Sequence, residues 1–330
     1  MTITPDEAEP RAEPLVQGRD ATQVVVVNQP SAVLVATDLT EASDLALKRG
    51  RLHADVTRAS LIVCHVVPDV FRHHPLAPRR DQDDAVLASD LAKRASDLVN
   101  AQVQRVLGDR AGEYRVAVET GSAADEIVRL AEQEGASLVL VGGRPELGRV
   151  AERVVRYTHA SVLVARPGPA TGKALVATDF WPGSLPAIEA GEELHRVGLE
   201  ITLIHAMDVP SSVPPDLLSP LGSTWMTPTK GSMDELRALG MSTLGGLAKQ
   251  HGFAHFEQVD GRAAEVLLSR AAAVEAEVIV LGSRGRSGLR RLLLGGVAER
   301  VVRGASCSVL VARHASLPRD AQGVAEPPKL

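Results

Sequence analysis

A loop rich in glycine and arginine, residues 282–296, is the part of the sequence best suited to chemistry. It follows the apolar run 278–281 and precedes a helical pattern that begins near Gly296. Glycines let backbone N–H groups approach an anion closely, and the N-terminus of the following helix offers further free N–H groups and a positive dipole end. Four arginines in the loop supply forked donors that suit phosphate. They are Arg284, Arg286, Arg290 and Arg291. The loop therefore predicts a binding site for a phosphorylated ligand.

This loop belongs to the second copy of an internal duplication. The words VAERVVR and SVLVAR occur at identical spacing in residues 150–166 and again in residues 297–313. Upstream, the apolar runs of the two copies correspond at 140 or 141 residues apart, but the repeated words are 147 residues apart. The chain is therefore a tandem duplication whose first copy lacks seven residues directly after its fourth apolar run.

The counterpart of the loop in the first copy is short, spanning residues 142–149. It is too short to surround a triphosphate. Within it Pro145 removes a backbone donor, and Glu146 places a negative charge where phosphate would sit. We expect the first copy to have lost the site.

Each copy alternates short apolar, β-branched runs with longer helical patterns. In the second copy we expect strands at 174–178, 201–206, 256–259, 278–281 and 309–311, and helices near 184–196, 233–250, 263–273 and 297–304. Strands without alternation, separated by helices, indicate a parallel sheet covered on both faces. The predicted fold class is α/β, with two tandem flavodoxin-like units, each a five-stranded parallel doubly wound sheet. Ligands of such sheets bind outside the carboxyl ends of the strands, at the switch point.

The pattern divides the chain into five segments. We expect a mostly disordered N-terminal extension (1–30), a first domain (31–166), a linker (167–172), a second domain (173–313) and a disordered tail (314–330). Residues 24–27 are a further candidate edge strand. The final strands, which both carry SVLVAR, are expected to pair with each other because an edge strand presents unpaired backbone groups.

Composition limits the class of protein. Hydrophobic residues make up 45% and charged residues 23% of the 330 residues, which is ordinary for a soluble globular protein. The net charge of −5 gives no basic field for nucleic acid, and no segment reaches the ~18 apolar residues of a membrane span. The acidic N-terminus does not resemble a signal peptide, so we expect a cytoplasmic protein. Cys64 and Cys307 lie in different copies and are expected to be buried thiols rather than a disulfide.

The spacing Gly282-x-x-Gly285, followed after nine residues by Gly295, resembles the nucleotide-binding loop of the ATP-binding universal stress proteins. The resemblance covers both copies, almost all of residues 31–313. It implies that the chain binds ATP, alone or with Mg²⁺, and acts as a non-enzymatic, nucleotide-dependent regulator of the stress response. A nucleotide-free interaction protein and a slow ATPase stay open as alternatives. The sequence identifies no partner protein, and a homodimer of the tandem chain is one open oligomeric state.

The resemblance implies ten contact positions in the second copy. They are Ala177, Thr178, Asp179, Ala206, Gly282, Arg284, Gly285, Gly295, Gly296 and Val297. Asp179 would contact the nucleoside and the backbone of Ala206 the adenine edge, while the remaining loop positions would surround the ribose and phosphates. The family usually has Ser or Thr after the last glycine, where this chain has Gly296, and the missing hydroxyl would weaken binding by ~1 kcal/mol.

Several polar residues have simpler structural readings. Asp38 is expected to cap the following helix, and Asp179 to combine such a role with ligand contact. His65 and His205 are expected to pack at strand ends rather than act in catalysis. Glu299 reappears as Glu152 in the first copy, which favours a structural role. His73 and His74 have no carboxylate or cysteine partners at metal-ligand spacing, so no metal site is expected there.

Overall fold

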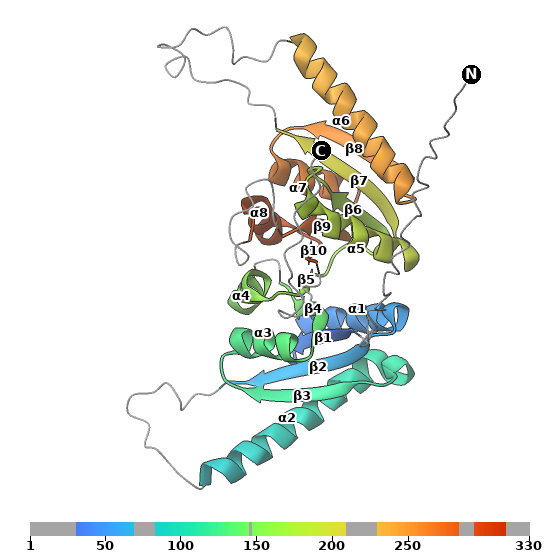
Figure 1. Cartoon of the computed structure of the whole chain (residues 1–330). Coiled ribbons are helices and arrows are strands. Elements are labelled where there is room, and N and C mark those ends of the chain that lie inside the picture. Colours follow the sequence, from blue (N-terminus) through green and yellow to red (C-terminus); the bar gives the residue numbers. More distant parts are fainter. Residues whose placement is uncertain (1–30, 69–82, 145–146, 209–229, 284–293, 315–330) are drawn as a thin grey trace, which may run out of the picture.

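The computed structural model describes residues 31–68, 83–144, 147–208, 230–283 and 294–314 (Figure 1). The candidate strand at 24–27, both terminal segments and His73-His74 lie outside these ranges, as do Arg284, Gly285 and the other arginines of the loop. Within the described part of the chain, none of the helices is long and apolar enough to cross a membrane.

The first unit alternates strands and helices. Its elements are β1 (Ala32–Thr37), α1 (Glu41–Thr57), β2 (Ser60–Val67), α2 (Asp83–Leu107), the 3-10 turn η1 (Gly108–Ala111), β3 (Arg115–Thr120), α3 (Ala123–Gln133), β4 (Ala136–Gly142), α4 (Arg149–Tyr157) and β5 (Ser161–Ala165). All six residues of β1 are buried, because helices cover the sheet on both faces.

The second unit repeats this order of strands and α-helices and differs in the place of its 3-10 turn. Its elements are β6 (Lys173–Ala177), η2 (Pro182–Ser184), α5 (Leu185–Arg196), β7 (Glu200–Met207), α6 (Lys230–Gln250), β8 (His255–Asp260), α7 (Ala263–Ala273), β9 (Val278–Gly282), α8 (Gly296–Gly304) and β10 (Ser308–Ala312). Each strand and helix expected in this copy is present, with ends that differ by at most three residues. The periodicity of the apolar runs therefore placed the elements correctly.

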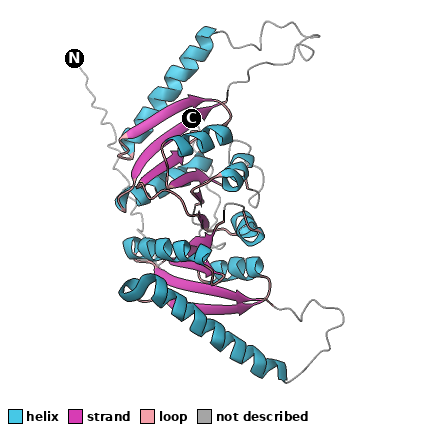
Figure 2. Cartoon of the chain, turned by 180° about the vertical axis from the view of Figure 1, so that it is seen from behind, coloured by secondary structure: helices cyan, strands magenta, loops and turns pink. Residues whose placement is uncertain are grey.

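The ten strands form one sheet in the order β3-β2-β1-β4-β5-β10-β9-β6-β7-β8. Helices α1, α2, α5 and α6 pack on one face of the sheet, and α3, α4, α7 and α8 on the other (Figure 2). Within each unit the strands are parallel. The predicted fold class of two tandem flavodoxin-like units, each five-stranded, parallel and doubly wound, is confirmed.

The two units join through their final strands. β5 and β10 pair antiparallel, with Leu163 opposite Leu310, and these leucines hold the same place in the two SVLVAR words. Such a contact is self-complementary, because each copy presents the same surface to the other. The prediction that the units pair through these strands is confirmed.

Hydrogen bonds at both ends of this pair repeat the symmetry. The Ser308 hydroxyl accepts the Arg166 N–H at 3.0 Å, and the Ser161 hydroxyl accepts the Arg313 N–H at 3.0 Å. The guanidinium of Arg166 donates to the carbonyl of Val302 at 2.6 Å, in the last turn of α8. Arg313 donates in the same way to a carbonyl of α4. Each unit thus supplies a cation to the negative end of a helix in the other unit.

A ring of charges joins α4 to α8. Glu152 contacts Arg156 of its own helix at 3.3 Å and Arg303 of the other unit at 2.5 Å. Glu299 contacts Arg303 at 3.4 Å and Arg156 at 3.3 Å. The expectation that Glu299 has a structural role is confirmed by these contacts. The expectation for the cysteines is confirmed as well, because Cys64 and Cys307 are both buried free thiols.

Candidate functional site

The expected ligand positions meet at the switch point of the second sheet. β6 lies between β7 and β9, with Val176 opposite Val280. Thr178 and Asp179 therefore follow β6 beside Gly282, the last residue of β9. Ala206 lies near the carboxyl end of the neighbouring β7. The fold thus brings Ala177, Thr178, Asp179, Ala206 and Gly282 to one edge, where ligands of such sheets bind.

The turn after β6 is held by its own side chains. The hydroxyl of Thr178, which is buried, accepts the Phe180 N–H at 3.1 Å and lies 3.1 Å from the hydroxyl of Ser184. Asp179 Oδ1 accepts the N–H of Trp181 at 3.1 Å. Phe180 has φ of 64°, an unusual conformation for a residue with a side chain. The Thr178 hydroxyl therefore shapes the turn that presents Asp179.

The first unit has the same turn with one difference. Leu39 also has φ of 64°, and its N–H donates to the Thr37 hydroxyl at 3.0 Å. Asp38 Oδ1, however, accepts two hydrogen bonds from Thr40, from the N–H at 3.0 Å and from the hydroxyl at 2.6 Å. Because Trp181 stands where the first unit has Thr40, Asp179 lacks this second donor. More of the carboxylate of Asp179 is left for a ligand.

The expectation that these aspartates cap helices was wrong. α1 begins at Glu41 with Thr40 at the N-cap, and α5 begins at Leu185 with Ser184 at the N-cap, and neither cap has a side-chain hydrogen bond. Asp38 and Asp179 instead bond the N–H two residues on, which closes a local turn before the helix.

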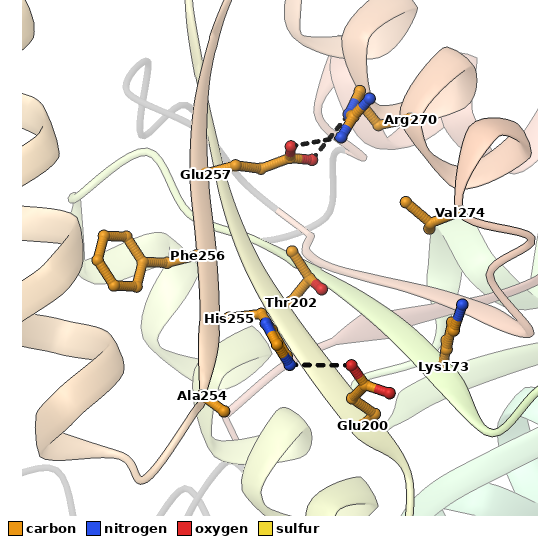
Figure 3. Close-up of a pocket in the computed structure, with 9 residues that line it drawn as sticks. All are labelled: Lys173, Glu200, Thr202, Ala254, His255, Phe256, Glu257, Arg270 and Val274. Carbon is orange, nitrogen blue, oxygen red and sulfur yellow. Dashed lines mark hydrogen bonds and ion pairs between the residues drawn. The ribbon is translucent and has the colours of Figure 1, made fainter.

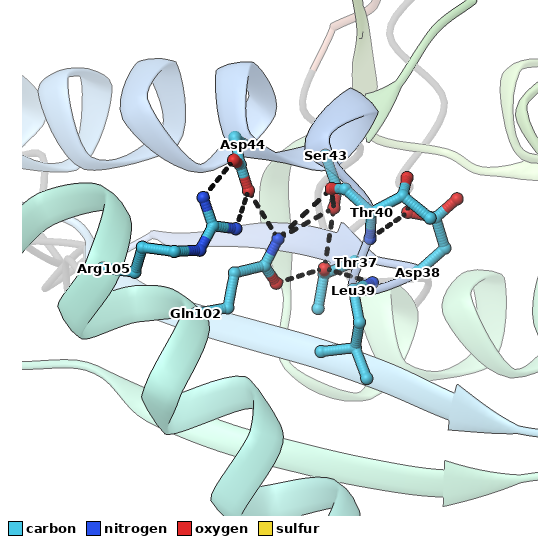
Figure 4. A network of polar contacts seen from close by, with 8 residues as sticks. All are labelled: Thr37, Asp38, Leu39, Thr40, Ser43, Asp44, Gln102 and Arg105. Atoms are coloured by element: carbon cyan, nitrogen blue, oxygen red, sulfur yellow. Dashed lines mark hydrogen bonds and ion pairs between the residues drawn. The ribbon is translucent and has the colours of Figure 1, made fainter.

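A polar network ties the first turn to the outer helix α2 (Figure 4). Thr37 donates to the Gln102 carbonyl at 2.6 Å, and the Gln102 amide donates to Asp44 at 2.7 Å. Arg105 adds two hydrogen bonds to Asp44 at 2.8 and 2.9 Å. Burial alone would raise the pKa of Asp44, but the hydrogen bonds from Arg105 and Gln102 outweigh it and lower that pKa. The polar groups around this turn are thus occupied within the protein.

The histidines at the strand ends pack as expected. Nδ1 of His205 lies 2.9 Å from the carbonyl of Thr178, and His65 makes the equivalent contact to Thr37 at 2.9 Å. The ring of Phe180 lies against His205, tilted by 33°, with centroids 4.2 Å apart. The prediction of a packed polar role is confirmed.

Gly282 and Gly142 have a packing role that the sequence did not reveal. A Cβ on Gly282 would lie 2.3 Å from the carbonyl oxygen of Gly183, and one on Gly142 would lie 2.6 Å from that of Ala42. The first turn of α1 passes directly over Gly142, and η2 passes directly over Gly282. Both positions therefore require glycine whether or not a ligand is bound.

In the second unit, backbone hydrogen bonds hold the two ends of the long loop together. The Gly295 N–H donates to the carbonyl of Ser283 at 2.9 Å, and Ser283 N–H donates to that of Ala312 at 3.1 Å. α8 then begins at Gly296, and Gly296 and Val297 are both exposed. The N-terminus of α8 therefore begins beside the carboxyl end of β9, and a helix N-terminus is a position that suits an anion.

In the first unit an arginine covers the corresponding place. A Cβ on Gly143 would lie 2.8 Å from Cγ of Arg166, whose Nε donates to the carbonyl of Arg144 at 3.0 Å. Burial lowers the pKa of Arg166, and its side chain is only 1% exposed. The expected effects of Pro145 and Glu146 lie outside the described residues.

Comparisons with known proteins agree with this arrangement. The sequence profile of the universal stress protein family matches residues 31–166 and 171–313. A universal stress protein of Mycolicibacterium smegmatis is 25% identical over 299 residues, covering 85% of this chain and 96% of the relative. A universal stress protein of Mycobacterium tuberculosis is 28% identical over 311 residues, covering 87% and 98%.

A solved structure shares the fold of the whole chain. The crystal structure of a universal stress protein from Archaeoglobus fulgidus superposes with a TM-score of 0.58 at 21% identity, covering 86% of this chain and 99% of that structure. Because the family profile matches both halves of the chain, the protein belongs to the universal stress protein family and carries two family domains in tandem.

Proposed function

We propose that this chain binds ATP in its second domain and uses it as a regulatory ligand, while the first domain is a degenerate partner. One observation carries the proposal: two turns of matching geometry follow β1 and β6, but the segment between β9 and α8 is seven residues longer than its counterpart between β4 and α4. The two ends of that segment are joined by the hydrogen bond between Gly295 and Ser283, and α8 begins with exposed residues. A carboxylate for the nucleoside and backbone donors for phosphate then lie at one edge.

Eight of the ten proposed contact positions lie in the described part of the chain. Asp179 supplies the carboxylate, and the exposed N-terminus of α8 supplies Gly295, Gly296 and Val297. Arg284 and Gly285 complete the proposal from the sequence alone. We divide the chain at the linker 167–172, so that residues 173–313 form the proposed nucleotide-binding domain.

Regulation would pass through α8. This helix begins at the loop, and one turn later Glu299 enters the ring of charges with Arg156 of the first domain. A nucleotide that orders the loop would bias the position of α8, and with it the contact between the domains. A ligand shifts such an equilibrium only through its differential affinity for the two states. A partner protein, or a second copy of the chain, would read out that shift.

Hydrolysis is expected to be slow. Fast phosphoryl transfer needs a positioned water and usually a metal-ligating carboxylate near the γ-phosphate. Glu299 is engaged by Arg156 at 3.3 Å and Arg303 at 3.4 Å, and Asp179 belongs to the nucleoside end. A turnover of roughly 1 s⁻¹ or above, abolished by Glu299→Gln, would establish the ATPase alternative instead.

Mass spectrometry of small molecules released by heat from the purified full chain tests the proposal. We expect adenine nucleotide at close to one per chain, and its absence even after incubation with ATP and Mg²⁺ would favour the nucleotide-free interaction protein. Gly296→Ser provides a sharper variant, because no atom of the described residues lies within 4 Å of a Cβ at this position. The added hydroxyl should strengthen ATP binding by about 1 kcal/mol, and weaker binding would count against phosphate at the start of α8.

A further inference from the structure

A cavity of about 380 Å³ opens at the amino ends of β6, β7 and β8, beside the C-terminal end of α7 (Figure 3). It is lined mainly by polar side chains. They include Lys173, Glu200, Thr202, His255, Glu257 and Arg270. The cavity lies at the opposite ends of the strands from Asp179 and Gly282, so it is separate from the proposed nucleotide site.

Two ion pairs hold the walls of this cavity in place. Arg270 donates to both oxygens of Glu257, at 2.9 and 2.6 Å, and His255 Nε2 lies 2.9 Å from Glu200. Bidentate pairing fixes the plane of the guanidinium. The Lys173 ammonium, Nη1 of Arg270 and the Thr202 hydroxyl, by contrast, bond to no described residue, and Figure 3 shows Thr202 between the two ion pairs.

The first domain provides an internal comparison. The positions of Thr202, Glu257 and Arg270 are filled there by apolar residues 140 residues earlier, namely Ile62, Ala117 and Leu130. The strand register supports this match, since Ile62 pairs with Arg115 as Thr202 pairs with His255. All three apolar residues belong to the buried core. At the same place in the fold, the second domain thus has a polar wall instead of core.

In the first domain, an ion pair crosses the place that corresponds to the cavity of the second domain. Arg115 of β3 pairs with Glu134 at the end of α3 at 2.6 Å. The corresponding residues of the second domain are His255, which turns to Glu200, and Val274, which cannot form an ion pair. The second domain therefore lacks this particular ion pair, and β8 is joined to the end of α7 by Glu257 and Arg270 instead.

We propose that this cavity is a second ligand site, specific to the second domain, for a small metabolite with a carboxylate or phosphate group. The unpartnered donors of Lys173, Arg270 and Thr202 suit an anionic group, and the pair of Glu200 and His255 suits hydroxyls on the rest of the ligand. Exchanging three core residues for polar ones gives up apolar burial, and ligand binding is a function that this exchange serves. The cavity volume lies in the range of small-molecule sites, about 300–1,000 Å³.

Amide NMR of the full chain, titrated with inorganic phosphate and separately with malonate at constant ionic strength, tests this site. We expect saturable shifts in β7, β8 and α7, with a Kd below about 1 mM for at least one anion, and the stronger of the two identifies the preferred group. Linear shifts with neither anion saturating, or shifts that ATP abolishes by competition, would overturn the proposal.

Two variants assign the binding to these residues. Lys173→Met should weaken it at least tenfold, whereas Lys249→Met, which removes an exposed lysine of α6, should leave it unchanged. The triple change Thr202→Ile, Glu257→Ala and Arg270→Leu restores the residues of the first domain and should abolish binding. If the triple variant does not fold, Lys173→Met alone decides, and unchanged affinity in that variant would overturn the site.

Discussion

The contact between the two domains is symmetric, whereas the carboxyl edges of their two sheets are not. At the contact, Leu163 faces Leu310 and the Ser161 and Ser308 hydroxyls each bond the arginine that follows the opposite strand. At the carboxyl edges, Asp38 is held by two hydrogen bonds from Thr40, while Asp179 receives one described bond from Trp181.

The reason for this difference lies in what each region contacts. A self-complementary interface uses the same surface twice, so a change in one copy of VAERVVR or SVLVAR disturbs a contact that the other copy also makes. Each carboxyl edge faces solvent or a ligand independently of the other. The identical words therefore mark the domain contact, and the seven-residue difference marks the place where we propose that the domains diverge in function.

The largest expected effect comes from breaking the symmetric contact. Leu163→Pro removes a backbone donor from β5 and cannot be accommodated inside a sheet, so we expect a loss of about 3 kcal/mol or more. Because β5 and β10 pair directly, both domains should lose stability together in a thermal melt. Leu163→Ala keeps the backbone donor and serves as the control. A second domain that melts unchanged in the proline variant would contradict the shared interface.

The close-packed glycines separate packing from binding. Gly142→Ala and Gly282→Ala each place a methyl group against backbone, and overpacking of this kind typically costs about 1–3 kcal/mol. Urea unfolding should show both losses, but only Gly282→Ala should also weaken ATP binding. Equal effects of the two variants on binding would mean that the domains share the ligand.

Replacing Arg166 or Arg313 tests whether the two symmetry-related arginines of the domain contact stabilise the protein equally. Arg166→Met leaves the carbonyls of Val302 and Arg144 without this donor, which should cost about 1–2 kcal/mol after the relief of a buried charge. Arg313 is less buried, so Arg313→Met should cost less. Urea midpoints of the two variants measure the difference in stability. A larger loss of stability for Arg313→Met would contradict the prediction that the more buried arginine contributes more.

The smallest effect concerns pH. Burial lowers the pKa of His53 on α1, which lies 3.8 Å from Glu193 of α5. In the unfolded chain the His53 imidazole takes up a proton near pH 6.5, while in the folded chain it does so at lower pH. The contribution of His53 is therefore fully present above about 6.5 and is lost as the pH falls towards its folded pKa. Burial raises the pKa of Glu193, which acts in the opposite direction.

Thermal melts should accordingly show that the His53→Gln variant loses less stability than the native chain between neutral and mildly acidic pH. Parallel pH profiles for the two proteins would show that His53 makes no contribution to the pH dependence of stability.

Much of the fold follows from the sequence because its signals are local. Unbroken apolar runs such as 278–281 predict buried parallel strands, and the repeated SVLVAR predicted the pairing that joins the sheets. Arg166 shows where this reasoning fails. An arginine after a strand is ordinarily exposed, and its burial depends on the carbonyl of Val302, 136 residues away in the chain.

The candidate site was predictable as a location but not as a set of contacts. The glycine loop and the aspartate after the first strand pointed to the switch point. The role of Gly282 could not be read from its type, because the constraint comes from Gly183 on a neighbouring segment. The polar cavity at the other edge was missed because Glu257 and Arg270 look like ordinary surface residues until the first domain shows Ala117 and Leu130 in their places.

Calorimetric titration of the full chain with ATP tests the central claim most directly, when the native protein is compared with Asp38→Ala and Asp179→Ala. The account predicts one site per chain, unchanged by Asp38→Ala and weakened at least tenfold, or about 1.4 kcal/mol, by Asp179→Ala. Two sites of equal affinity, or equal losses in the two variants, would contradict it.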